Sequence, residues 1–599
     1  MANHLASQLF ASHGAGWPAA GTVVRLRMDQ VLLEERDGLV TLLGFESLGR
    51  ARIACDLALV APAREADGPD ARDDLTYVQA MASAIGAEFV RPGAGPPAAL
   101  HRRGFAAPGR TLLTSVPGAA GAGAFGMLVL GGEPAEAAAA LAGEPSRVVR
   151  PRVVGVRLVR ELRAGVGGAE ILVALAGALA GEARDALVEY HGEGVEALPF
   201  AERIAMASLG GAMLGARASL FPSDGVTRAR LASRGRDADW RRVDGGGDGF
   251  DFALVFDLSR VRVGALDLSR VRVGALAEDD DLLMLAAAAR AGASLEGWEV
   301  IVGGRTARAA LAPGDALSAL ADAGASVIDA GEPRALAPLE PGTLACGEDG
   351  ETVSAGARPV SVAALIHALG RGFAGASEPA AAPLDSAEVL APAPPGEQVS
   401  VVRGAAHPLP VLVAPMSDSP RGPVVWSARH DVAVESILAW GPRAQARRGD
   451  AAALAALAFH SGEGDTGVRR GGWSVVTGAG RWGDGGPHEP AARALAALGV
   501  RVVIAAAFPP AHARALAAQG LLPLRWRRSQ DAASIAVGDE LELPGISGEL
   551  ARGGRVVVRD LTRGLAFDVL PAVESEWLDL VRAGGLLASL ARRQQEAGA

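Results

Sequence analysis

The sequence contains no lysine and very little cysteine. Its 58 basic residues are therefore all arginine, and 68 acidic residues outnumber them, giving a formal net charge of −10. Nucleic-acid binding requires clustered cations that neutralise phosphates, so the overall charge disfavours that function. The two cysteines, Cys55 and Cys346, are too few for a disulfide framework, a four-thiolate zinc site or the three thiolates of an open iron–sulfur cluster.

Long apolar runs and paired histidines are missing as well. No run of 18 or more apolar residues occurs without charges, as a membrane-spanning helix would require. The opening segment, MANHLASQLFASHGAGWP, lacks the basic flank and apolar core of a secretory signal. We therefore expect a cytoplasmic protein without membrane contact. No two of the ten histidines are spaced i, i+3 or i, i+4, so the sequence predicts no two-histidine metal site.

What is present is typical of a large α/β protein. The 599 residues, 49% of them hydrophobic, allow about four domains at roughly 150 residues each. Short Val- and Leu-rich runs alternate with Ala-rich stretches, which predicts mainly parallel sheets covered by helices. Predicted strands include Thr111–Val116, Val153–Leu158 and Val500–Ile504, and predicted helices include Ala169–Leu179 and Asp280–Ala291. Asp37-Gly38 predicts a turn within an early alternating segment.

Two segments interrupt this alternation. Residues 376–399 are rich in Ala and Pro and have little apolar periodicity, which predicts an extended linker. The decapeptide DLSRVRVGAL at 257–266 is repeated without change at 267–276. A perfect copy of ten residues is too short for a solenoid unit, so we interpret it as an insertion tolerated at a surface loop.

One short motif is compatible with cofactor binding. Gly121–Gly126 fits G-x-G-x-x-G after a predicted strand, the pattern of a dinucleotide-binding loop. Chance matches are expected in a chain with 78 glycines, so the motif alone is a hypothesis. The chain has no G-x-S-x-G elbow and no Walker A motif.

Blocks along most of the chain follow the order and spacing of a known family. They include FGMLVLGG (125–132), VEYHGEGVEAL (188–198), FPSDGVTRA (221–229), LGVRVVIAAAF (498–508) and GDELELP (538–544). On these residues the chain resembles the aconitase family, which includes aconitate hydratase and isopropylmalate dehydratase, in its compact bacterial single-chain form.

The resemblance implies an aconitase-like α/β fold. Its body, 1–375, would hold three α/β domains at roughly 1–150, 151–255 and 277–375 around a 4Fe-4S cluster. A mobile α/β swivel domain, 400–599, would follow the linker at 376–399. The implied chemistry is reversible dehydration and hydration of hydroxy-acids, in which a cluster iron acts as Lewis acid and a serine alkoxide acts as base.

The sequence differs from this family at the positions expected for catalysis and for cluster binding. Non-matching residues stand at the expected catalytic positions, namely Ala61, Pro62, Val116, Gly118, Glu435, Ser436, Pro487 and His488. The expected cluster-ligand positions hold Arg305, Gly331 and Arg334. Arginine has no available lone pair for iron, and Pro487 has no hydroxyl to deprotonate. Glu489 is retained, without its flanking Ser and Arg.

We therefore predict a catalytically inactive aconitase-like protein, a pseudoenzyme, with no catalytic residues, no metal and no cofactor. It would act as a scaffold, as an assembly partner of another protein or of itself, or as a binder of a small anion. In the last case Arg305, Arg334 and Arg371 would converge on the vacated cluster cavity and bind a carboxylate or phosphate. Otherwise internal carboxylates such as Glu332 must neutralise these arginines, because unpaired buried charge is costly.

Two alternatives remain. One is an active hydro-lyase with cluster-independent chemistry, using Glu435, His488 and Glu489 as acid and base. The other is an RNA-binding relative, which the acidic net charge disfavours. Because an inactive swivel domain has no need to open for substrate, we also expect it to be packed closely against the body.

Overall fold

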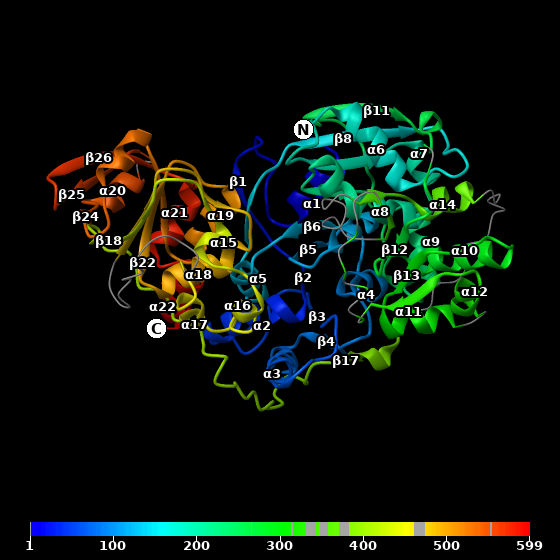
Figure 1. Ribbon diagram of the computed structural model, residues 1–599, viewed down its shortest axis with the longest axis horizontal. Helices are drawn as coiled ribbons and strands as arrows, with labels where there is room; N and C mark the ends of the chain where they lie inside the picture. The colour runs from blue at the N-terminus through cyan, green and yellow to red at the C-terminus, as the bar shows by residue number, and fades with distance from the viewer. Residues whose placement is uncertain are drawn as a thin grey trace.

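A computed structural model gives the structure of the chain. It describes residues 2–264, 266–312, 315–330, 332, 335, 337, 339, 343–347, 357–369, 383–459, 474–551 and 554–598. Within these residues the strands form three open sheets, one closed barrel and two small strand pairs. Figure 1 shows the barrel on one side and the three open sheets on the other. The predicted α/β class with mainly parallel sheets is confirmed.

The first sheet has the strand order β17-β4-β3-β2-β5-β6. Its strands are parallel except β17, which pairs antiparallel with β4. The strands are β2 (Gln30–Leu33), β3 (Leu57–Val60), β4 (Glu88–Val90), β5 (Thr111–Thr114), β6 (Leu128–Gly131) and β17 (Val389–Leu390). The accompanying helices are α2 (Glu35–Ser47), α3 (Pro69–Ile85), α4 (Pro97–Gly104) and α5 (Pro134–Leu141). We call this the first unit.

The second and third sheets follow the same plan, with the earliest strand inside the sheet and later strands on both sides. The second has the order β10-β9-β8-β11 and the third β14-β13-β12-β15-β16, both parallel. Ligands of such sheets bind beyond the carboxyl ends of the strands, where the order reverses.

The second unit comprises β8 (Val153–Val159), β9 (Leu187–His191), β10 (Ala218–Leu220), β11 (Phe252–Asp257), α6 (Gly168–Leu179), α8 (Phe200–Leu214) and α9 (Gly225–Ser233). The third unit comprises β12 (Val271–Val273), β13 (Trp298–Val302), β14 (Ser326–Asp329), β15 (Leu344–Cys346), β16 (Arg358–Pro359), α10 (Asp279–Arg290), α11 (Gly304–Leu311), α12 (Ala316–Asp322) and α14 (Val362–Ala368). A small pair, β1 (Val23–Leu26) and β7 (Ser146–Val149), accompanies the first unit, as does α1 (Leu5–Ser12).

The C-terminal unit is built on the barrel β18-β20-β22-β23-β26-β25-β24. Its strands are β18 (Arg421–Ala428), β20 (Ser474–Gly478), β22 (Val500–Ala505), β23 (Leu522–Trp526), β24 (Glu540–Glu542), β25 (Val556–Asp560) and β26 (Leu565–Pro571). Its helices include α15 (Val434–Ile437), α18 (His488–Ala497), α19 (Pro510–Ala518), α21 (Ser575–Arg582) and α22 (Leu586–Gly598). A further pair joins β19 (Val432–Ala433) to β21 (Trp482–Asp484).

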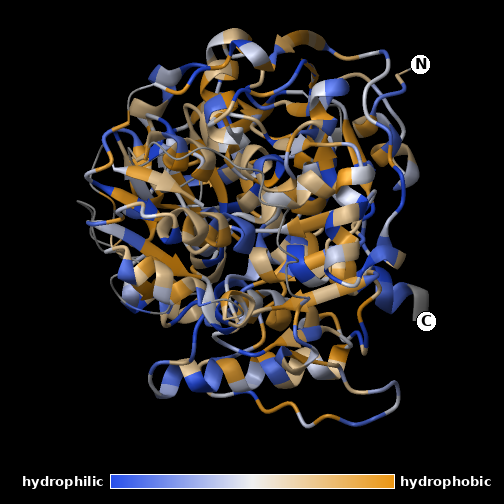
Figure 2. Cartoon of the chain, turned by 90° about the vertical axis from the view of Figure 1, so that its right-hand side faces the viewer, coloured by the Kyte–Doolittle hydropathy of each residue, from blue (hydrophilic) through white to orange (hydrophobic). Residues whose placement is uncertain are grey.

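The C-terminal unit is packed against the first unit, as expected for a closed arrangement. One cluster of buried hydrophobic side chains includes residues of α2 and α5 together with residues of the barrel, α21 and α22. A Cβ added to Gly44 of α2 would lie 3.2 Å from Leu587 Cδ1 of α22. Figure 2 shows hydrophobic strands in the interior of the molecule and hydrophilic segments more often at its margin. In the described ranges, no helix is long and apolar enough to cross a membrane.

The segment between the third unit and the barrel is partly described. Residues 383–399 include β17, which adds a short strand to the first sheet. From residue 391 to residue 420 the chain has no helix or strand. It is nevertheless attached to the first unit, because the Arg403 guanidinium lies 3.2 Å from the Glu46 carboxylate and His407 Nε2 lies 2.6 Å from Asp74 Oδ1.

The predicted turn at Asp37-Gly38 is wrong. Both residues lie in the first turn of α2, which buries Leu39, Leu42 and Phe45 on one face. Helical spacing of the apolar residues outweighs the low helix propensity of one glycine, a cost of about 1 kcal/mol.

The interpretation of the repeated decapeptide as a surface-loop insertion is also wrong. The second copy supplies β12, the central strand of the third sheet, and its Val271 and Val273 are fully buried. In the first copy, Leu258 and Val261 are buried in the core of the second unit instead. Each copy therefore anchors a different hydrophobic core.

The two copies provide an internally matched stability test. Val273→Ala removes methyl groups from a fully buried position in a central strand, so we expect it to destabilise the third unit by about 2 kcal/mol. Val263→Ala, the same substitution in the other copy, affects a half-buried side chain and should cost clearly less. Urea titration followed by tryptophan fluorescence measures both effects, and equal shifts of the midpoint would contradict the assignment of β12.

Candidate functional site

The candidate site lies where the three open-sheet units meet. The turn after β5 contacts the turn after β12, since a Cβ added to Gly118 would lie 2.6 Å from Leu276 Cδ1. The loops after β4 and β13 also meet, because Arg305 N–H donates to Gly93 O and Thr306 N–H donates to Ala94 O. The carboxyl ends of parallel strands, where α/β proteins bind ligands, therefore face one another here.

Seven charged side chains occupy this meeting point, and we call them the junction network. Arg102 and Arg103 come from α4, Arg230 and Arg234 from the end of α9, and Glu278, Asp279 and Asp280 from the start of α10. All seven are at most 7% exposed. The network therefore joins the first, second and third units through buried ion pairs.

Glu278 is the common acceptor of the network. Its Oε1 accepts from Arg102 Nε at 3.1 Å, and its Oε2 accepts from Arg230 Nη2 at 2.6 Å and Arg234 Nη2 at 3.0 Å. Arg103 donates to Asp279, and Arg230 also donates to Asp280. Since these partners belong to different units, the hydrogen bonds fix the units relative to one another.

The electrostatics favour an ionised Glu278. Burial raises the pKa of this carboxyl, but the adjacent Arg102, Arg234 and Arg230 outweigh burial and hold the pKa well below its usual range. The carboxyl of Asp281 shows the opposite effect. Burial together with the charges of Glu202 and Glu278 raises its pKa well above its usual range.

Little space remains beside the network. A cavity of about 20 Å³ is lined by Arg103, Arg234, Glu278 and Thr306 among others, which is room for one water molecule. A second cavity of about 50 Å³ between the second and third units is lined by residues that include Glu202 and Cys346. Small-molecule sites usually measure about 300 Å³ or more, so neither cavity is large enough for a typical metabolite.

The body residues at expected catalytic positions pack around this junction. Ala61, Pro62 and Val116 are buried after strands β3 and β5. Gly118 has φ +75°, and its carbonyl accepts a hydrogen bond from Arg102 Nη1 at 3.0 Å. At this positive φ a residue other than glycine would be strained, and a Cβ at position 118 would also require the Leu276 side chain to move.

Arg305 lies at the surface and is paired with carboxylates of this chain. Its Nε and Nη2 donate to the two oxygens of Glu388 at 3.0 and 2.8 Å, and its Nη1 donates to Glu65 Oε1 at 3.3 Å. The hydrogen bonds to Glu388 raise the pKa of this guanidinium. Glu332 is not its partner, since the Glu332 carboxylate accepts from Asp329 N–H. Gly331, Arg334 and Arg371 lie outside the described residues.

The residues present do not fit the iron–sulfur cluster that the resemblance implies. Cys55 lies in the core of the first unit and Cys346 in that of the third. Burial raises the pKa of Cys55 to about 12 and also raises that of Cys346, whereas iron ligation requires the thiolate. Across the part of the chain that the structure describes, no group of three or more His, Cys, Asp or Glu is arranged to hold a metal ion.

On the C-terminal unit, Glu435 and His488 lie close together. A Cβ added to Gly485 would lie 3.0 Å from the Glu435 carboxylate. Burial lowers the pKa of His488, and the Glu435 charge opposes this shift. Ser436 follows in α15 and Pro487 immediately precedes α18.

Glu489 is directed to a different partner. It is 2% exposed, and its Oε2 accepts from the backbone N–H of Ala135 in α5 at 3.0 Å. This hydrogen bond crosses from the C-terminal unit to the first unit. The structure therefore brings Glu435 and His488 together, while the Glu489 carboxylate already has a protein donor.

The G-x-G-x-x-G segment has a packing role. Residues Ala119–Phe125 form a buried 3-10 helix against α8 and β10. A Cβ at Gly123 would lie 2.0 Å from the Ser219 carbonyl oxygen, and one at Gly121 would lie 2.6 Å from Ser208 Oγ. These glycines allow close contact between units, and the hypothesis of a dinucleotide-binding loop is wrong.

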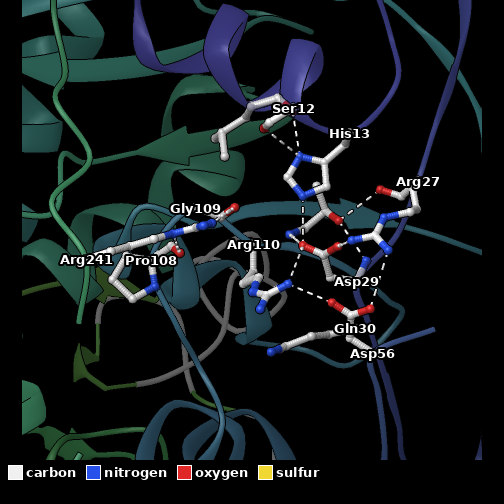
Figure 3. Close-up of polar contacts among 12 residues, drawn as sticks. Ser12, His13, Arg27, Asp29, Gln30, Asp56, Pro108, Gly109, Arg110 and Arg241 are labelled. Carbon is white, nitrogen blue, oxygen red and sulfur yellow. Dashed lines mark hydrogen bonds and ion pairs between the residues drawn. The ribbon is translucent and has the colours of Figure 1, made fainter. Parts of the chain in front are cut away.

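Sequence reasoning missed a Ser-His-Asp arrangement, shown in Figure 3. Ser12 Oγ lies 3.1 Å from His13 Nδ1, and His13 Nε2 lies 2.7 Å from Asp29 Oδ2. Nδ1 also lies 2.6 Å from the Leu9 carbonyl oxygen, which only accepts, so Nδ1 carries its hydrogen and cannot take the Ser12 proton. Because Asp29 precedes β2 at the amino edge of the first sheet, we assign this cluster a structural role.

Comparison with known families matches two regions. Residues 52–245 match the aconitase family (aconitate hydratase), and residues 460–529 match the aconitase C-terminal domain. A putative mitochondrial aconitate hydratase of Aspergillus fumigatus is 31% identical over 214 residues, which cover 33% of this chain and 26% of that protein. The chain thus matches about a quarter of the length of such relatives.

A second curated relative and a solved structure are also similar to the chain. The large subunit 2 of 3-isopropylmalate dehydratase from Archaeoglobus fulgidus is 25% identical over 268 residues, covering 43% of this chain and 63% of that subunit. Among solved structures, aconitase X of Thermococcus kodakaraensis in its holo-form is 12% identical with a TM-score of 0.36, covering 61% of this chain and 99% of that chain.

The junction network is tested by Glu278→Gln. The variant leaves three buried guanidinium groups without their shared charge, so we expect a loss of about 3–5 kcal/mol and a clear fall in melting temperature. Glu193→Gln, which removes the exposed partner of Arg157, is the matched control and should leave the melting temperature nearly unchanged.

The pH dependence of the same variant follows from the lowered pKa of Glu278. A carboxyl whose pKa is lower in the folded state stabilises the fold fully above its unfolded-state pKa of about 4.3 and loses that contribution as the pH falls. The wild-type advantage over Glu278→Gln should be complete above about pH 5 and shrink below it. An advantage independent of pH between about 3 and 6 would contradict an ionised Glu278.

Proposed function

We propose that the chain is a catalytically inactive member of the aconitase family, to which its sequence is similar, and that it acts as a structural scaffold or assembly partner. Relatives in the family are hydro-lyases by name. The observation that carries the proposal is the junction network, whose buried ion pairs fill the meeting point of the three units. The charged side chains at this place already pair with one another, which disfavours the binding of a substrate there.

The residues at the expected chemical positions support this proposal. Gly118 has no side chain and a positive φ that disfavours other residues, Pro487 has no hydroxyl, and Arg305 has no lone pair for a metal. At these positions no residue could ligate the iron that acts as Lewis acid in the family's mechanism. No residue there could replace the serine that acts as base.

The alternative functions are less well supported. Cluster-independent acid–base chemistry would use Glu489, but the Glu489 carboxylate is buried and accepts from Ala135. A small-anion site would use Arg305, but its donors are taken by Glu388 and Glu65. RNA binding is disfavoured because acidic residues outnumber basic ones and give a net charge of −10.

The second sheet ends in an edge strand, which is compatible with assembly. β11 is the last strand of the second sheet, and its residue Val255 is 66% exposed. The unpaired backbone groups of an edge strand bind extended segments of other chains. We therefore propose that the partner is a protein.

Reconstitution with iron and sulfide tests the proposal that the chain holds no cluster and is catalytically inactive. After anaerobic purification and incubation with iron and sulfide, we expect no stoichiometric iron, no cluster absorbance and no turnover of citrate or isocitrate. The reason is that the described residues offer no thiolate set to the cluster.

An aconitate hydratase with an intact cluster, treated in parallel, is the positive control. Stoichiometric iron together with hydratase activity in this chain would contradict the proposal. Iron-free turnover that disappears in Glu489→Gln would instead establish the altered acid–base enzyme.

A further inference from the structure

Two like charges face each other across the small strand pair of β1 and β7. Arg25 of β1 and Arg147 of β7 are register partners in this antiparallel pair. Side chains of directly opposite residues share one face of the pair, with their Cβ atoms roughly 5 Å apart, so like charges there are destabilising. The pairing therefore calls for a negative charge beside these two arginines.

A third arginine reaches the same place from the C-terminal unit. Glu144 Oε1 accepts from Arg25 Nη1 at 2.9 Å and from Arg593 Nη2 of α22 at 3.0 Å. Because both nitrogens bond to one oxygen atom, the two guanidinium groups lie side by side. The side chains of Arg25 and Arg593 are 52% and 47% exposed, so both are accessible to a ligand from solution. We call Arg25, Arg147 and Arg593 the arginine triad.

Arg147 is the member of the triad without a carboxylate partner. Its Nε is buried and has no hydrogen-bond partner, and within the described ranges no carboxylate forms an ion pair with its guanidinium. Burial, followed by the charge of Arg25, lowers the pKa of Arg147, and Arg593 acts in the same direction. Glu144 and Glu136 oppose this shift. An anion beside Arg147 would offset the repulsion from the other two arginines.

The two nearby carboxylates do not balance three guanidinium groups. Glu144 supplies one negative charge, which two members of the triad already share. Glu136 serves its own helix, since its Oε2 accepts from the backbone N–H of Glu133 at 3.1 Å, and its charge also acts on Arg514 of α19. Burial raises the pKa of Glu136, which disfavours its ionised form. These groups therefore leave the triad with an excess of positive charge.

The triad adjoins a small cavity between the first unit and the C-terminal unit. The cavity has a volume of about 10 Å³, and its lining includes Glu144, Ser146, Arg147, Trp577 and Leu586. The hydroxyl of Ser146 is buried there without a hydrogen-bond partner. Because this space holds no more than about one water molecule, a larger anion has to bind outside it, against the two exposed members of the triad.

We propose that the arginine triad binds a phosphate group, which fastens α22 of the C-terminal unit to the β1–β7 pair. A phosphate monoester carries a charge of about −1.5 to −2 near neutral pH and offers three strong acceptor oxygens, which matches an excess of positive charge held by three guanidinium groups. Guanidinium groups bind phosphate oxygens through paired, charge-assisted hydrogen bonds. The ligand is inorganic phosphate or a small phosphate monoester.

This site is separate from the junction network. Its members come from β1, β7 and α22, whereas the network is built from α4, α9 and α10. The inference does not depend on whether the chain is a catalyst. Failure of phosphate binding would leave the proposed scaffold function unaffected, and iron binding in the reconstitution experiment would leave the phosphate site unaffected.

Titration calorimetry of the full chain with inorganic phosphate and with glycerol 3-phosphate tests the proposal. At least one of the two should bind in a one-to-one ratio, and the tighter of them identifies the source of the phosphate group. Arg147→Gln removes the unpaired guanidinium and should weaken this binding at least about tenfold, as expected for a hydrogen bond to a charged group. Absence of binding by both compounds, or equal affinity in Arg147→Gln, overturns the proposal.

The melting temperature of the same variant separates ligand binding from a structural role. Without phosphate, Arg147→Gln should melt at or above the wild-type temperature, because it removes a like charge opposite Arg25. With phosphate, the wild type should gain more than the variant, since a ligand that binds the folded state stabilises it. A structural role for Arg147 would instead lower the melting temperature of the variant without phosphate, and that result overturns the proposal.

Arg157→Gln is the matched control. Arg157 is an arginine of β8 whose side chain is 55% exposed and pairs with Glu193, so this variant should keep the wild-type response to phosphate. It also corrects for the general stabilisation of folded proteins by phosphate salts. Should Arg147→Gln fail to fold, Arg593→Gln changes an exposed side chain of α22 and should weaken binding at least about tenfold. Unchanged binding in Arg593→Gln overturns the proposal.

Discussion

The bonds that Glu278 accepts are the constraint on which the arrangement of the three open-sheet units depends. One carboxylate from α10 accepts from Arg102 of the first unit and from Arg230 and Arg234 of the second. Removing ions from water costs several kcal/mol each, and a buried set recovers that cost only when every member is paired. The network therefore tolerates a single geometry, and any shift of one unit would leave a buried charge without its partner.

The same constraint limits what this junction can bind. A reaction centre must hold donors, acceptors or open metal positions ready for a substrate, whereas the junction network directs its charged groups at one another. The remaining cavity beside it, about 20 Å³, suits one water molecule. Glu489 follows the same pattern at the other contact, where its carboxylate accepts a backbone hydrogen bond from Ala135. At both places, buried charged residues act as contacts between units.

The sequence predicted the fold class and most elements because periodicity is a local property. Val153–Leu158 and Asp280–Ala291 were placed within one residue of β8 and α10, since apolar spacing reports directly on strand and helix faces. The candidate site could be predicted only in part. Arg102 and Glu278 lie 176 residues apart, and charged residues in a sequence ordinarily indicate solvated surface. The sequence pattern therefore does not show that packing of the three units buries these charged side chains.

The repeated decapeptide separates what sequence determines from what tertiary structure decides. In both copies the aspartate accepts from the backbone N–H two residues later, Asp257 from Ser259 and Asp267 from Ser269, both at 3.0 Å. This turn is the same because it needs only neighbouring residues. The valines of the two copies differ in secondary structure, since only those of the second copy lie between β13 and β15 and form a strand. Strand pairing requires partners distant in the chain, so identical residues take the structure that their neighbours in space allow.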